Sequence, residues 1–257
     1  MAKAQLKGVV FDLDGVITDT ARLHQDAWED MFNDFLQQWS QREGIHFAPF
    51  DPGKDYHTYV DGKPRYQGVQ SFLESRGIEL PWGDDQDSPD QWTVCGLGNR
   101  KNQAFGKVLR ADGPDVYETS VELVKSLRAA GVRTGIASSS RNAQEVLEMG
   151  GVAELFDTRV DGVVSKELGL AGKPEPDIFV SAARNMGLSP AESVVVEDAI
   201  SGVAAGAKGG FGLTLGIARS VAAESLREAG ADVVVSDLGE ISTAQLMDEF
   251  EKKAAGA

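Results

Sequence analysis

The side chains best suited to chemistry in this sequence follow short apolar runs or lie in a loop before a helical segment. They are Asp12, Asp14, Ser138, Lys173, Glu197 and Asp198. In an open parallel sheet, ligands bind outside the carboxyl ends of the strands, where such residues would meet. The sequence therefore predicts four carboxylates, a hydroxyl and an ammonium at one edge of a sheet.

This set of groups fits phosphoryl transfer. Clustered carboxylates repel one another unless a divalent cation neutralises them, and oxygen ligands with spare water positions favour Mg²⁺. A bound Mg²⁺ attracts phosphate, and Ser138 and Lys173 would hold the phosphoryl oxygens in the transition state. Asp12 beside the metal stays ionised and can attack phosphorus. Asp14, two positions along and on the same face, can exchange a proton with the leaving or entering oxygen.

The elements that must position these groups are recognisable from apolar runs. Strands are predicted at 8–11, 132–138, 193–198, 211–217 and 231–237. Amphipathic segments alternate with the last four, beginning near 141, 176, 199 and 221. This alternation predicts an α/β fold, a doubly wound, Rossmann-like parallel sheet. We expect the tail at 251–257 to be frayed.

The stretch at 23–111 has a different pattern, with helix-like segments and no strand signal. Helices are expected at 21–39, 66–77 and 100–109, separated by loops at 45–62 and 79–98. The simplest topology inserts this helical unit after the first strand. The domains are then an α/β core at 1–22 and 112–257 and a mostly helical cap at 23–111, with ligands expected in a cleft between them.

Composition excludes several classes of function. The 257 residues carry a net charge of −15, which disfavours nucleic-acid backbones and anionic membranes as partners. Cys95 is the only cysteine, so neither an intrachain disulfide nor a thiolate zinc cage can form. The apolar run near the start is too short for a signal peptide. We expect a cytoplasmic protein, monomeric or weakly dimeric.

Four segments together carry a family resemblance. FDLDGVITDT at 11–20, IASSSRN at 136–142, GKPEPDIF at 172–179 and VEDAISGV at 196–203 resemble the haloacid dehalogenase (HAD) superfamily in all four of its motifs, in order. The resemblance implies an HAD core with an inserted cap. It makes Asp12 the aspartyl-phosphate nucleophile and Asp14 the general acid/base that also gives a backbone carbonyl to Mg²⁺. Asp198 becomes a direct metal ligand with Glu197 beside it, so the predicted metal site comprises Asp12, Asp14, Glu197 and Asp198. Ser138 and Lys173 hold the phosphoryl group.

Further residues resemble the β-phosphoglucomutase-like subfamily, whose members interconvert β-glucose 1-phosphate and glucose 6-phosphate through a bisphosphate. Thr20 and His24 match positions that delay the acid/base aspartate until substrate is bound. The resemblance implies contacts to the second phosphate by Arg65, Lys101, Ser140 and Asn142. The loops at 45–62 and 79–98 are longer than in compact bacterial members, which leaves the identity of the sugar phosphate open.

Other functions remain to be separated from this one. A phosphatase acting on a small sugar phosphate would use the same core, with water as the acceptor. A non-catalytic binding protein would keep the fold but have no turnover. The presence of the full set of motif residues argues against this alternative. A serine hydrolase using Ser138 or Ser139 would need a G-x-S-x-G turn, which the sequence lacks.

Overall fold

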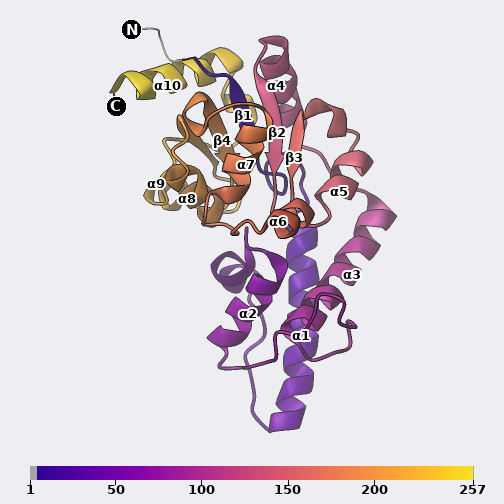
Figure 1. The fold of residues 1–257 in the computed structure, drawn as a ribbon. Helices are drawn as coiled ribbons and strands as arrows, with labels where there is room; N and C mark the ends of the chain where they lie inside the picture. Colours follow the sequence, from indigo (N-terminus) through magenta and orange to yellow (C-terminus); the bar gives the residue numbers. More distant parts are fainter. Residues whose placement is uncertain (1–4, 257) are drawn as a thin grey trace. The chain divides into compact units, whose positions relative to one another are not determined.

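The computed structural model describes residues 5–256, so the first four residues and the last residue of the expected core lie outside it. By their internal contacts the residues form two compact units. The core unit comprises Met1–Asp19 and Pro114–Ala257, and the inserted unit comprises Thr20–Gly113. Figure 1 shows the course of the chain through both.

The core unit is built on a six-stranded parallel sheet in the order β3-β2-β1-β4-β5-β6. The strands are β1 Gly8–Phe11, β2 Arg133–Ala137, β3 Thr158–Val160, β4 Ser193–Glu197, β5 Leu213–Ile217 and β6 Val233–Val235. In the centre of the sheet, Val10 of β1 lies opposite Gly135 and Val195. The predicted parallel α/β fold is confirmed. Strand β3 was not predicted, because its three residues include a central Arg159.

Helices cover the sheet on both faces (Figure 1). They are α4 Glu118–Ala129, α5 Ala143–Met149, α6 Gly162–Leu168, α7 Asp177–Asn185, α8 Ile200–Lys208, α9 Ala223–Glu228 and α10 Thr243–Gly256. Short 3₁₀ turns lie at Ala153–Leu155, Pro190–Glu192 and Leu238–Glu240. Val10 and Val195 pack against Phe179 of α7 and Ala205 of α8. Val9 points to the opposite face of the sheet and is also fully buried, so both faces are covered.

The chain end differs from the expectation of a frayed tail. Residues 251–256 continue α10, which contacts α4 and β5. Leu246 and Phe250 are buried on the helix, and Phe250 lies against Gly212 at the start of β5. The prediction failed because the apolar positions that anchor this helix lie before the Lys- and Ala-rich segment.

The inserted unit contains α1 Ala21–Glu43, a π-helix at Tyr56–Val60, α2 Arg65–Ser75 and α3 Val94–Asp112. Its core joins Phe32 and Phe35 of α1 to Phe72 of α2 and Leu97 of α3. Helix α3 begins at Val94, well before the predicted start near Arg100. Thr93 supplies the missing signal, because its side chain accepts a hydrogen bond from Gly96 N at 2.9 Å and caps the helix.

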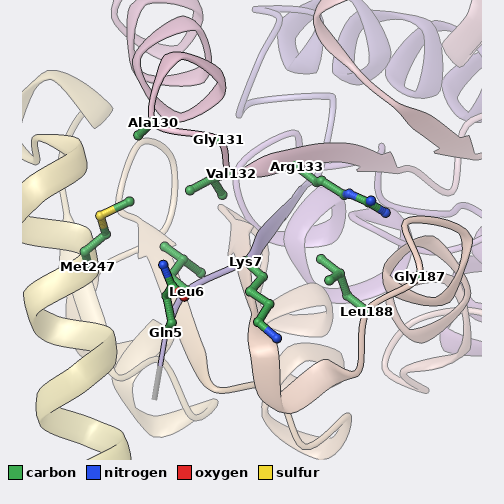
Figure 2. Close-up of a pocket in the computed structure, with 10 residues that line it drawn as sticks. All are labelled: Gln5, Leu6, Lys7, Ala130, Gly131, Val132, Arg133, Gly187, Leu188 and Met247. Atoms are coloured by element: carbon green, nitrogen blue, oxygen red, sulfur yellow. The ribbon is translucent and has the colours of Figure 1, made fainter. Parts of the chain in front are cut away.

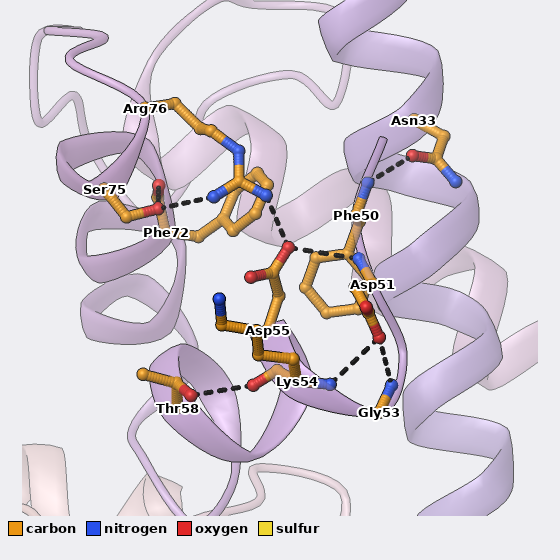
Figure 3. A network of polar contacts seen from close by, with 10 residues as sticks. All are labelled: Asn33, Phe50, Asp51, Gly53, Lys54, Asp55, Thr58, Phe72, Ser75 and Arg76. Atoms are coloured by element: carbon orange, nitrogen blue, oxygen red, sulfur yellow. Dashed lines mark hydrogen bonds and ion pairs between the residues drawn. The ribbon is translucent and has the colours of Figure 1, made fainter. Parts of the chain in front are cut away.

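The segment at 45–62, expected as an extra loop, is tied into the inserted unit. Asp55 is buried and pairs with the guanidinium of Arg76, and its carboxylate also accepts a hydrogen bond from Asp51 N at 3.1 Å (Figure 3). The Arg76 guanidinium lies over the ring of Phe72, 4.6 Å from its centroid. Phe50 of the same segment enters the aromatic core. Within the described residues, every helix is too short or too polar to cross a membrane.

Candidate active site

The end of β1 delivers Asp12 into a buried position at the carboxyl edge of the sheet. The residue is 6 % exposed, and the Asp12 amide donates to Val196 O of the neighbouring β4 at 2.9 Å. The chain then turns tightly, and Gly15 N donates to Thr18 O at 2.8 Å. Gly15 has a φ of +83°, a backbone conformation that glycine adopts without strain.

Lys173 links Asp12 to Glu197 inside the protein. Its ammonium donates to Asp12 Oδ1 and to Glu197 Oε1, each at 2.5 Å, and the lysine is only 2 % exposed. The loop before α7 and the ends of β1 and β4 therefore meet at one buried ion cluster. Sequence reasoning placed all three residues at this edge, and the structure brings them into direct contact.

The cluster has more negative than positive charge. Burial raises the pKa of Asp12 to about 8; Lys173 opposes this rise, while Glu197 and Asp14 add to it. Burial alone would lower the pKa of Lys173, but the charges of Asp12 and Glu197 raise it above its ordinary value. The lysine thus stays charged, and one ammonium serves two buried carboxylates.

Asp198 lies beside the turn that follows β1, next to Gly15. A Cβ atom at Gly15 would come within 2.0 Å of Asp198 Oδ2, so the absence of a side chain there lets the turn approach this carboxylate. Asp14 precedes Gly15 directly and forms a bridge with Thr18. Asp12, Asp14 and Asp198 are therefore gathered around one short turn.

The predicted Ser138, Ser140 and Asn142 form a compact loop after β2. Ser140 N donates to Ser138 Oγ at 3.1 Å, and Asn142 N donates to Ser140 Oγ at 3.2 Å. The neighbouring chain holds this loop from outside, because Ser138 N donates to Val160 O and Gly162 N donates to Ser140 O, each at 3.0 Å. Ser138 is buried, and the unpredicted β3 supports the loop that carries it.

A metal site made of side chains alone is not formed in the described part of the chain, where no three His, Cys, Asp or Glu side chains gather suitably. Glu197 uses both oxygens elsewhere, since Oε1 accepts from Lys173 and Oε2 accepts from Ala199 N at 2.6 Å. The oxygens that remain as possible metal ligands are those of Asp12, Asp14 and Asp198. These hard oxygen ligands fit a divalent cation such as Mg²⁺.

The predicted residues of the inserted unit lie on its helices or directly before them. Thr20 precedes α1, and His24 of α1 meets Lys101 of α3, with 2.5 Å between His24 Nδ1 and Lys101 Nζ. Lys101 is buried, and its ammonium lies 5.0 Å from the ring centroid of Trp28. Arg65 begins α2, with its guanidinium over the ring of Tyr66.

A cavity of about 320 Å³ lies at the opposite end of the strands (Figure 2). It is lined by Leu6 and Lys7 before β1, by Arg133 at the start of β2, and by Leu188 and Met247. The basic groups in its wall already have partners within the chain, because Lys7 pairs with Glu192 and Arg133 donates to Met186 O. This cavity is separate from the carboxyl edge that carries the predicted residues.

Sequence reasoning missed the residues that shape the site without chemical groups of their own. Gly162 is one example, because a Cβ atom there would lie 2.7 Å from Ser139 O and would push the serine loop away. Asp161 before it is buried, caps α6 through Val163 N and Val164 N, and pairs with Arg159. The Asp-Gly pair at 161–162 was the available signal, but it lies beside the strand that was not predicted.

Comparisons with known proteins show what the whole chain is similar to. A sequence model of the haloacid dehalogenase-like hydrolase family matches residues 6–210. A β-phosphoglucomutase of Mycobacterium tuberculosis is 48% identical over 240 residues, which cover 92% of each chain. A phosphorylated carbohydrates phosphatase of Thermotoga maritima is 28% identical, covering 90% of this chain and 94% of its own. In fold, the chain is similar to a β-phosphoglucomutase structure from Clostridium difficile, with a TM-score of 0.77 at 22% identity, covering 97% and 99%.

Proposed function

Because this chain belongs to the haloacid dehalogenase-like hydrolase family, we propose that it is a β-phosphoglucomutase that works through a phosphorylated Asp12. The enzyme class of phosphoryl transfer follows from the family and from the mycobacterial relative. The observation that carries the proposal is the buried contact of Lys173 with both Asp12 and Glu197, beside Asp14 and Asp198 at the carboxyl edge of the sheet.

In the proposed cycle, Asp12 first carries a phosphoryl group on a carboxylate oxygen. The C6 hydroxyl of β-glucose 1-phosphate attacks the phosphorus of phospho-Asp12, Asp14 takes the hydroxyl proton, and the aspartyl P–O bond breaks. The resulting bisphosphate reorients. Asp12 then attacks the phosphorus at C1, Asp14 returns the proton to the departing sugar oxygen, and glucose 6-phosphate leaves with the enzyme phosphorylated again.

Lys173 and Ser138 are assigned to the transferring phosphoryl group. A fixed ammonium and a hydroxyl placed before the reaction stabilise charge on the phosphoryl oxygens, with little reorganisation at the moment of transfer. Glu197 acts through Lys173, because its Oε1 accepts one of the lysine hydrogen bonds while the other goes to Asp12. Two hydrogen bonds orient the loop that carries Ser138: Ser140 N donates to Ser138 Oγ, and Asn142 N donates to Ser140 Oγ.

We propose Mg²⁺ as the cofactor, held by carboxylates of Asp12 and Asp198 and by the backbone carbonyl of Asp14. When bound, the cation supplies charge neutralisation for the phosphoryl oxygens. Glu197 would lie beside the metal rather than on it, since both of its oxygens accept hydrogen bonds from the protein.

The family resemblance further assigns the second phosphate to Arg65, Lys101, Ser140 and Asn142. A mutase must keep its phospho-aspartate from water until the intermediate returns, which requires a grip on the phosphate that is not being transferred. Thr20 and His24 are assigned to the timing of Asp14. The His24–Lys101 contact inside the inserted unit is consistent with joint action of these two residues.

The alternative is a sugar-phosphate phosphatase, favoured by the family's hydrolase description and by the Thermotoga maritima relative. It would use the same Asp12 chemistry, with water in place of the sugar hydroxyl. The two functions differ in their products, since a mutase returns glucose 6-phosphate and a phosphatase releases inorganic phosphate.

A product assay tests the proposal. The protein is incubated with β-glucose 1-phosphate, Mg²⁺ and a trace of β-glucose 1,6-bisphosphate, and both glucose 6-phosphate and inorganic phosphate are measured. We expect glucose 6-phosphate to accumulate in large excess over phosphate. Free phosphate without glucose 6-phosphate would reject the mutase and favour the phosphatase. The α-anomer and other hexose and pentose phosphates, assayed in parallel, define the sugar preference.

A further inference from the structure

The carboxylate of Glu197 lies against the backbone of α8 at Gly202. A Cβ atom built at Gly202, near the start of that helix, would lie 1.7 Å from Glu197 Oε1, 2.0 Å from Cδ and 2.7 Å from Cγ. Real Cβ atoms do not approach other atoms so closely. The carboxylate of Glu197 therefore occupies the space that a side chain at position 202 would need.

Glu197 has no alternative position that keeps its contacts. It is 1 % exposed, so it cannot turn into solvent. Its Oε2 accepts a hydrogen bond from Ala199 N at 2.6 Å, and its Oε1 accepts one from Lys173 at 2.5 Å. A methyl group at position 202 would displace the carboxylate from both donors.

The displacement would reach the nucleophile. Lys173 divides its ammonium between Glu197 and Asp12, so losing the first partner frees the lysine to move relative to the second. Positional errors of about 1 Å can reduce turnover on the order of 100-fold. A backbone position with no chemical group thus controls the geometry of phosphoryl transfer.

We propose that Gly202 is a positioning residue, whose missing side chain holds Glu197 against Lys173 and thereby Lys173 against Asp12. The proposal rests on the proposed function in that Asp12 is the group that attacks phosphorus. It applies equally to transfer to a sugar and to water, because both use the same nucleophile.

The test is Gly202→Ala, assayed on β-glucose 1-phosphate and on the general substrate p-nitrophenyl phosphate. We expect kcat to fall on the order of 10- to 100-fold on both, while the thermal unfolding transition stays cooperative. The matched control is Gly206→Ala, one turn later on the same helix face. The atoms nearest to its Cβ would be those of Thr214 and Val195 at 3.0–3.1 Å, rather than those of Glu197. We expect its kcat to stay within about twofold of wild type, whatever its effect on stability.

A rescue variant separates positioning from general damage. Glu197→Asp removes one methylene and makes room for the methyl group, so Gly202→Ala with Glu197→Asp should have a higher kcat than Gly202→Ala alone. A kcat for Gly202→Ala close to wild type would overturn the proposal. So would a double variant whose loss equals the product of the two single losses, because independent effects combine in that way.

The two proposals fail separately. If wild type hydrolyses p-nitrophenyl phosphate but makes no glucose 6-phosphate, the mutase assignment is wrong, and the role of Gly202 is still tested on the hydrolysis. If wild type makes glucose 6-phosphate and Gly202→Ala does so equally well, the mutase stands and the positioning role is wrong.

Discussion

Asp12 and Glu197 share one ammonium in a buried cluster, so each charged group in the cluster depends on the others. Under the proposed mechanism Asp12 forms the covalent intermediate, and its amide analogue cannot. Asp12→Asn should therefore lower kcat on the order of 10³- to 10⁶-fold, with the fold retained. The measurements are the product assay and thermal unfolding.

The control for that substitution is Asp248→Asn, because the Asp248 side chain is 61% exposed and pairs with nearby Lys252 on α10. It should leave kcat unchanged. A tenth or more of wild-type activity in Asp12→Asn would show that another group is phosphorylated, and mass spectrometry of the beryllofluoride-treated protein would locate it.

Removing Lys173 tests the electrostatics of the same cluster. Lys173→Met leaves two carboxylates buried without their counter-charge, which should lower the free energy of unfolding by about 3–5 kcal/mol at pH 8 in metal-free buffer. Burial holds the Asp12 pKa above its unfolded value, and loss of Lys173 removes an opposing effect. Raised carboxyl pKa values stabilise the folded state at low pH and cease to do so as pH rises, so the deficit should shrink toward pH 5.

Urea unfolding at pH 5 and pH 8 checks this sign. Lys208→Met is the matched control, because Lys208 pairs with Glu175 at 2.9 Å on the surface, where both side chains are about half exposed. Such pairs contribute about 0–1 kcal/mol, so the deficit of Lys208→Met should be small at both pH values. Equal deficits for Lys173→Met at the two pH values would contradict the assigned charge balance.

At the scale of elements, the sequence predicted the strands and helices whose apolar residues follow a clear pattern. The run at 8–11 became β1 with the same bounds, since all four residues are buried and flanked by polar ones. β3 was missed because its pattern is three residues long. The early start of α3 was missed because Gly96 and Gly98 suggest a loop, whereas they allow close contacts with Gln91 and Tyr66.

In the candidate site, the residues with reactive side chains were predicted, and the glycines that make room for them were not. Charged and hydroxyl residues at strand ends were predictable because parallel strands bring their carboxyl ends to one edge. The glycines at 162 and 202 were not, because their function depends on the distance to Ser139 O and to Glu197 Oε1. No residue pattern encodes such a distance, even for Glu197 and Gly202, which lie in the same short segment of the chain.

The segment before α2 offers a prediction at this scale. Asp55→Ala leaves the Arg76 guanidinium without its buried partner and should lower the free energy of unfolding by about 3–5 kcal/mol. Asp51→Ala removes side-chain hydrogen bonds from Gly53 N and Lys54 N at an exposed turn, so its loss should be clearly smaller. Urea unfolding should rank the losses in that order, and the reverse order would show that the ion pair contributes little.

For the whole molecule, each unit has a hydrophobic core of its own. The core unit buries Val10 and Phe179 between sheet and helices, and the inserted unit buries an aromatic cluster around Phe32. Within the core unit, the two segments that lead to the insertion run side by side. Asp19 N donates to Asp115 O at 2.8 Å, and Thr18 pairs with Val116 in an antiparallel bridge.

This geometry predicts that the insertion can be removed. Antiparallel segments joined in this way accept a loop of two to four residues, so replacing residues 20–113 with a short Gly-Ser loop should leave a core unit that folds cooperatively. Far-UV circular dichroism and urea unfolding measure the fold, and p-nitrophenyl phosphate measures phosphoryl transfer. We expect a folded protein that has lost isomerisation, because Arg65 and Lys101 are absent. A chain that unfolds or aggregates would show that the core unit depends on the insertion, against the independence of the two hydrophobic cores.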